Sequence, residues 1–110
     1  MGIEVQVWSE ALLMGWKDAE PPEIGEGGGT FETLYGPAKR AGEEFELLDY
    51  VDPYGETVFN QVQIRTVLDE LRRLRPYARS PIDERTYNRL IGLAEMVKRE
   101  VHTYLVFIGD

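Results

Sequence analysis

The sequence contains no cysteine, and histidine occurs only once, at His102. A disulfide framework, a thiolate zinc site, an iron–sulfur cluster and a cysteine nucleophile are therefore excluded. A histidine-based metal site or a catalytic triad would need partners that a single imidazole does not supply. We therefore expect neither a metal nor a cofactor.

Long hydrophobic runs are also missing. The longest unbroken apolar segment runs from Tyr104 to Ile108, far short of the roughly 20 residues of a membrane-spanning helix. The opening residues, MGIEVQVWSE, include two acids and lack the basic segment that begins a secretory signal peptide. These features predict a soluble, cytoplasmic protein that does not bind membranes.

Basic residues are scarce in the first half of the chain. Residues 1–56 carry 13 acids and 3 bases, whereas residues 57–110 carry 7 acids and 9 bases, for a net charge of −8. An acidic half should repel nucleic acid and attract a basic partner protein. The alternative is that the acidity only keeps a small protein in solution.

The start of the chain predicts one strand followed by irregular structure. Apolar and polar residues alternate over residues 3–8, which predicts a strand with one buried face at Ile3, Val5 and Val7. Residues 17–43 are acidic and rich in glycine and proline, so we expect an irregular region there. Within it, Gly36-Pro37 allows one short helical turn but no long helix.

Residues 44–59 predict a β-hairpin. Residues 44–51 and 56–59 are strand-like, and Asp52-Pro53-Tyr54-Gly55 between them suits a type I turn. The block YVDPYGETVFNQ at residues 50–61 resembles a block of small bacterial proteins of unknown function. The resemblance implies a bacterial origin and a hairpin that leads into a helix, and it implies no activity.

Two amphipathic helices and a strand complete the chain. Asn60 and Gln63 form a capping box before a helix that ends at Pro76, with an apolar stripe of Ile64, Val67, Leu68, Leu71 and Leu74. Ser80-Pro81 begins the next helix, whose stripe is Tyr87, Leu90, Ile91, Ala94, Val97 and Val101. Residues 103–108 predict a buried strand that is apolar on both faces.

Together these elements predict one α+β domain over residues 1–110, with a hairpin–helix–helix–strand core at residues 44–108. We expect a small mixed or antiparallel sheet of three to five strands with both amphipathic helices packed on one face. Such helices can bury their stripes only against a sheet or against each other. The first and last strands are expected at the centre of the sheet.

Several polar groups allow both a chemical and a structural interpretation. Asp49, Asp52, Glu56 and Asn60 could form a cation site or a carboxylate pair, or they could serve the turn and the helix cap. His102 is either a lone general base or a residue that complements the dipole at the end of the last helix.

Glycine-rich and arginine-rich segments are equally open to two interpretations. The glycines at positions 25, 27, 28 and 29 match neither phosphate-loop pattern, so we expect a flexible loop. Seven arginines form either an anion-binding patch or a solvated helical face: Arg65, Arg72, Arg73, Arg75, Arg79, Arg85 and Arg89. The solvated face is favoured by two i,i+4 ion pairs, Asp69–Arg73 and Glu95–Arg99.

The leading functional hypothesis is a non-enzymatic interaction protein that presents an acidic surface to a basic partner, in the manner of an immunity protein, an antitoxin or an inhibitor. The residues expected to bind are Trp8, Trp16, Glu20, Glu23, Glu26, Glu32 and Tyr54. One alternative is a small enzyme or ligand-binding domain that uses carboxylates and His102. Another is a structural subunit, which leaves a homo-oligomer open.

Overall fold

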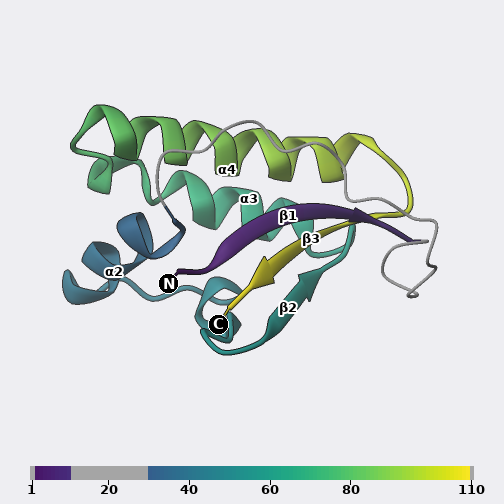
Figure 1. Cartoon of the computed structure of the whole chain (residues 1–110), viewed down its shortest axis with the longest axis horizontal. Coiled ribbons are helices and arrows are strands. Elements are labelled where there is room, and N and C mark those ends of the chain that lie inside the picture. The colour runs from purple at the N-terminus through teal and green to yellow at the C-terminus, as the bar shows by residue number, and fades with distance from the viewer. Residues whose placement is uncertain (1, 11–29, 110) are drawn as a thin grey trace.

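A computed structural model describes residues 2–10 and 30–109 and confirms the α+β class (Figure 1). Its sheet has three antiparallel strands in the order β1-β3-β2: β1 (Glu4–Ser9), β2 (Glu56–Phe59) and β3 (Thr103–Ile108). The helices are α2 (Glu32–Arg40), α3 (Ile64–Arg72) and α4 (Pro81–Arg99), with the 3₁₀ turns η1 (Leu48–Tyr50) and η2 (Arg75–Tyr77). No helix in these residues is both long and apolar enough to cross a membrane.

Strands β1 and β3 form the long pair of the sheet. The predicted alternation in β1 is confirmed, because Val5 and Val7 are buried opposite Phe107 and Leu105 of β3. The prediction of two central strands is half right. Strand β3 lies at the centre, but β1 is an edge strand of the sheet formed by the described residues.

The predicted hairpin is wrong. Strand β2 pairs with β3, and residues 44–51 form a loop that contains η1 instead of a strand. The backbone N–H groups of Leu47 and Leu48 donate to a side chain, Glu70, so they are not available to a strand ladder. The turn itself is confirmed, since Asp52 accepts from the Tyr54 N–H at 2.8 Å through its side chain.

Helix α2 is longer than the single turn that Gly36-Pro37 predicts, so that prediction is wrong. A proline inside a helix costs about 3 kcal/mol through a lost hydrogen bond and a clash. Leu34 and Ala38 of α2 are fully buried, and the Phe31 ring packs edge-on against Phe107 at 4.9 Å between centroids. Burial of a side chain as large as Leu or Phe contributes about 1.5–3 kcal/mol, so the packing outweighs the proline.

Helix α3 follows the predicted capping box. The Asn60 side chain accepts from the Gln63 N–H at 3.0 Å, and the Gln63 side chain accepts from the Asn60 N–H at 3.0 Å. All five residues of the predicted stripe are buried. The helix ends at Arg72, and Pro76 lies in η2 beyond that end.

Helix α4 begins at the predicted cap, where Ser80 accepts from the Asp83 N–H at 3.1 Å. Tyr87, Leu90, Ala94 and Val97 of its predicted stripe are buried, Ile91 is partly buried, and the buried Leu93 was not predicted. Val101 lies beyond the helix and is 71% exposed, so its place in the stripe is wrong. Helices α3 and α4 pack on each other on one side of the sheet, and α4 contacts β1 and β3 (Figure 1).

Candidate functional site

A strongly acidic surface segment is the acidic loop, residues 43–56, which contains η1 and ends at Glu56, the first residue of β2. It carries six acids and no base: Glu43, Glu44, Glu46, Asp49, Asp52 and Glu56. Lysine and arginine are absent from the whole interval between Arg40 and Arg65. The loop therefore concentrates much of the net negative charge of the chain on one short segment.

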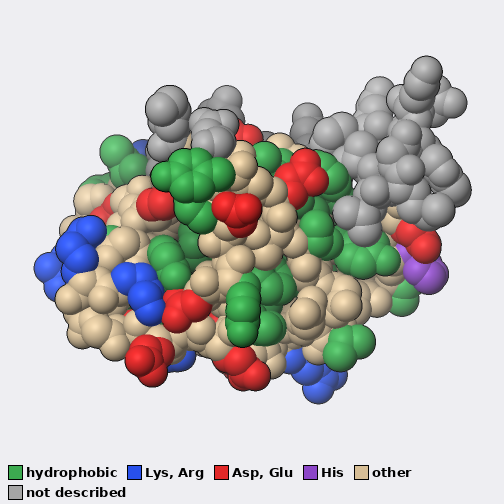
Figure 2. Space-filling model, turned by 90° about the horizontal axis from the view of Figure 1, so that it is seen from below, with side chains coloured by type: hydrophobic (Ala, Val, Ile, Leu, Met, Phe, Trp, Pro, Cys, Tyr) green, Lys and Arg blue, Asp and Glu red, His purple; other side chains and the backbone are tan. Residues whose placement is uncertain are grey.

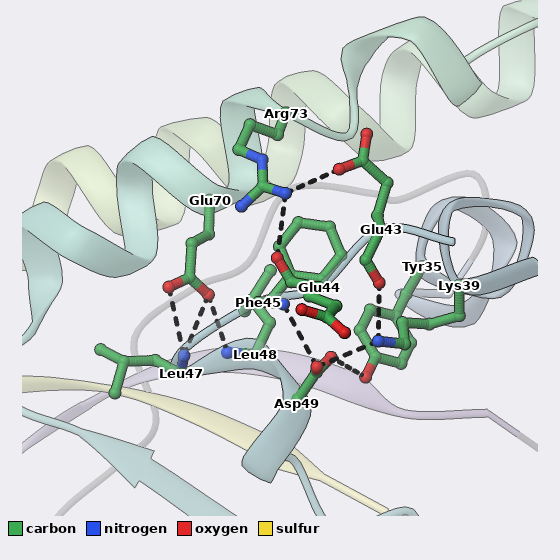
Figure 3. Close-up of polar contacts among 10 residues, drawn as sticks. All are labelled: Tyr35, Lys39, Glu43, Glu44, Phe45, Leu47, Leu48, Asp49, Glu70 and Arg73. Atoms are coloured by element: carbon green, nitrogen blue, oxygen red, sulfur yellow. Dashed lines mark hydrogen bonds and ion pairs between the residues drawn. The ribbon is translucent and has the colours of Figure 1, made fainter. Parts of the chain in front are cut away.

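A buried carboxylate holds the middle of the acidic loop (Figure 3). Glu70 of α3 is only 5% exposed, and its oxygens accept the N–H of Leu47 at 3.1 Å and of Leu48 at 2.9 Å. Because a buried carboxylate is stable only when it is hydrogen-bonded, these two backbone donors are the reason that Glu70 can lie inside. Glu70 was not among the predicted residues, although it lies three residues after Val67 on the buried side of α3.

Asp49 joins the acidic loop to α2. Its carboxylate accepts from the Tyr35 hydroxyl at 2.6 Å, the Lys39 ammonium at 3.0 Å and the Phe45 N–H at 3.2 Å. Burial opposes ionisation of Asp49, but the hydrogen bonds from Tyr35 and Lys39 outweigh it and hold its pKa below the ordinary value. Burial and the bond to Asp49 raise the pKa of the Tyr35 hydroxyl.

Arg73, the residue that follows α3, joins the first residues of the acidic loop to the end of that helix. Its guanidinium donates to the Glu43 carboxylate at 2.6 Å and to the Glu44 carbonyl at 2.9 Å, and it lies over the Phe45 ring at 4.5 Å (Figure 3). The hydrogen bond from Arg73 lowers the pKa of the Glu43 carboxyl. The acidic loop is thus tied to both α2 and α3.

These contacts support the structural interpretation of the predicted polar cluster. Asp49 binds three groups of its own chain, Asp52 accepts from the Tyr54 N–H, and Asn60 caps the turn before α3. Within residues 2–10 and 30–109, no group of three or more His, Asp or Glu side chains is placed to hold a metal ion.

The outer side of the acidic loop is left free. Tyr50 is 77% exposed and Tyr54 is 82% exposed. Four exposed acids have no cationic partner among the described residues: Glu44, Glu46, Asp52 and Glu56. Figure 2 views the molecule from the side of η1 and β2. Acidic and hydrophobic side chains are interspersed on this face, and most of the Lys and Arg side chains visible in this view lie at its left end.

The predicted binding residues do not form one site in the described chain. Trp8 pairs with Tyr104, whereas Gly55, next to Tyr54, bonds to Gly109, so about 17 Å of β3 separates the two positions. The Glu32 carboxylate accepts from the Ile3 N–H at 2.7 Å and is occupied in that role. Trp16, Glu20, Glu23 and Glu26, together with the predicted glycine loop, lie outside the described residues.

His102 is not at the end of α4, where the sequence placed it. The helix ends at Arg99, and His102 lies in the turn before β3 with a φ of 62°. Its Nδ1 is 3.4 Å from a Glu10 carboxylate oxygen, and both side chains are exposed. A cavity of about 200 Å³ lies beside His102, and its other described lining residues are Asn60, Gln61, Val62, Thr103 and Tyr104.

The predicted arginine pairs also differ from those observed. Asp69 and Glu95 both pair with Arg72, at 3.2 and 3.3 Å, instead of with Arg73 and Arg99. Arg89 contacts the N-terminal strand, where its guanidinium donates to the Val5 carbonyl at 3.3 Å. Comparison of the chain with protein-family models, curated proteins and solved structures finds no match in any of the three.

Proposed function

We propose that the protein is a non-enzymatic interaction protein whose acidic loop binds a basic partner protein. The observation that carries this proposal is the exposure of acidic and tyrosine side chains on the outer side of the acidic loop. Four exposed acids that have no cationic partner in the described part of the chain lie on the same loop as Tyr50 and Tyr54, which are 77% and 82% exposed. Exposed tyrosines on a loop whose charged residues are all acidic contribute little to the packing of their own domain.

The chemistry of the acidic loop suits such an interface in three ways. Unpaired carboxylates attract a basic surface over distances of about a Debye length and raise the association rate. Tyrosine is enriched among the residues that contribute most to binding. Glu70, Asp49 and Arg73 hold the loop in one conformation, so little conformational entropy is lost when a partner binds.

The biological setting is part of the proposal. We propose a bacterial, cytoplasmic protein of the immunity, antitoxin or inhibitor type, which blocks a basic protein by covering its surface. The resemblance of residues 50–61 supports the bacterial origin. An acidic surface suits this role because proteins that act on nucleic acids carry basic surfaces for an acidic inhibitor to cover.

The experiment compares two double variants with the same change in charge. The loop variant is Glu44→Gln with Glu46→Gln. The control is Glu84→Gln with Glu100→Gln, which neutralises one exposed acid in the first turn of α4 and one at the residue that follows the helix. Basic proteins captured from a bacterial lysate by the wild-type chain are purified, and association rates are then measured by biolayer interferometry at 50 and 300 mM salt.

We expect the loop variant to associate several-fold more slowly than wild type at low salt, with a weaker salt dependence, and the control to bind like wild type. Tyr54→Ala should mainly accelerate dissociation and cost about 1–2 kcal/mol of binding. Equal losses in the two double variants would show that only net charge matters, and the proposal would then be wrong.

A further inference from the structure

A groove lies between α2 and the segment that leads from η2 into α4, and it shares no residue with the acidic loop. Its volume is about 370 Å³, within the range of small-molecule sites. The described residues that line it come from both sides: Thr33, Pro37, Arg40, Ala41, Tyr77, Arg79 and Asp83. We call it the α2–α4 groove.

Two arginines from different segments line the α2–α4 groove. Arg40 comes from the last turn of α2, and Arg79 comes from the segment before α4. The Arg40 guanidinium lies back along its own helix, since a side chain at Gly36 would meet its Nη1 at 3.3 Å.

Neither guanidinium has a carboxylate within ion-pair distance among the described residues. Two unpaired arginines that line a groove of this size leave room and charge for an anion.

The other polar groups of the groove add donors. The Thr33 hydroxyl has no hydrogen-bond partner among the described residues, and the Tyr77 hydroxyl donates to Glu43 at 3.2 Å. Asp83 is the one carboxylate among the described lining residues. Its Oδ2 accepts from the Arg79 N–H at 3.1 Å, so that oxygen is already used inside the chain. The positive end of the α4 dipole also lies at this side of the groove.

We propose that the α2–α4 groove binds a phosphate group. A carboxylate presents two oxygens in a plane and is satisfied by a single guanidinium fork. A phosphate presents three or four oxygens in different directions, which suits a groove lined by Arg40 and Arg79 from two segments together with Thr33. Its double negative charge balances the two guanidinium groups. This inference does not depend on the proposed partner of the acidic loop.

The test is a titration followed by NMR of the backbone amides of the full chain. Inorganic phosphate, phenyl phosphate and acetate are added separately at one ionic strength, which is kept constant with sodium chloride. The variant is Arg40→Gln with Arg79→Gln, and the control is Arg65→Gln with Arg99→Gln, which removes two exposed arginines from α3 and the far end of α4.

We expect both phosphates to shift the amides of Thr33, Arg40 and Arg79, and acetate to bind at least tenfold more weakly. The groove variant should lose at least tenfold in phosphate affinity, and the control should stay within twofold of wild type. Tighter binding of phenyl phosphate would identify a phosphate ester as the ligand, and tighter binding of inorganic phosphate would identify the free ion.

The proposal is overturned if acetate binds as tightly as phosphate, or if the control loses as much affinity as the groove variant. Phosphate-induced shifts that leave the groove amides unmoved would overturn it as well. The partner-binding experiment on the acidic loop stays valid under each of these outcomes.

Discussion

Glu70 is the most buried charged side chain that the structure describes, with 5% of its surface exposed. Its two oxygens are the acceptors for the N–H groups of Leu47 and Leu48. If the carboxylate were removed, both donors would remain inside the protein without a partner. A buried donor without a partner costs about 1–3 kcal/mol.

We therefore expect Glu70→Ala to lower the free energy of unfolding by about 2–4 kcal/mol, as measured by urea denaturation. Glu70→Gln keeps one carbonyl acceptor and should lose less. Asp69→Ala, which removes the neighbouring exposed acid, is the control and should change stability by about 0.5 kcal/mol or less. A Glu70→Ala protein as stable as the control would show that Glu70 does not hold the acidic loop.

At the scale of elements, α4 contains a glycine that its packing does not need. Gly92 lies inside the helix on an exposed side, and a Cβ there would meet nothing within 4 Å. Glycine inside a helix costs about 0.5–1 kcal/mol relative to alanine, because its unfolded backbone has more freedom to lose. Gly42, just after α2, has a φ of 92°, which strains any other residue.

The expected result is that Gly92→Ala raises the free energy of unfolding by about 0.5–1 kcal/mol, while Gly42→Ala lowers it by about 1 kcal/mol or more. Thermal denaturation of the two variants beside wild type measures both effects. Destabilisation by Gly92→Ala would mean that α4 packs against something on that side in solution.

At the scale of the whole molecule, the acidic loop is tied to α2 and α3 by carboxylates whose pKa values are lowered. Glu43 is bound by Arg73, and Asp49 is bound by Tyr35 and Lys39. A group whose pKa is lower in the folded chain contributes stability above its unfolded pKa. That stability is lost as the pH falls through the folded value.

For Asp49 the unfolded value is close to 3.8, so its contribution is present at neutral pH and declines as the pH falls below about 4. Asp49→Asn should be less stable than wild type at pH 7, and its stability should fall less between pH 5 and pH 2.5. Urea denaturation across this pH range measures the difference. An identical decline in both proteins would contradict the assignment.

The sequence alone determined the features that depend on near neighbours. The Asp52 turn, the Asn60–Gln63 box and the Ser80 cap each join groups no more than three residues apart. The alternation in β1 and the stripes of α3 and α4 likewise repeat within a few residues. The α+β class and the placement of both helices on one face follow from these patterns, because their apolar faces need a common surface.

Only the tertiary structure decided what depends on distant partners. Strand β2 pairs with β3, almost fifty residues later, and the N–H groups of Leu47 and Leu48 bond to Glu70 instead of a strand. The burial of Leu34 and Phe107 extended α2 through a proline. The candidate surface in the structure differs from the predicted one for the same reason. The Glu32 side chain, predicted to bind a partner, is bound to Ile3, whereas Glu44, Tyr50 and Tyr54 are exposed. Local spacing cannot show whether a charge will find a partner, since that depends on which segments the fold brings together.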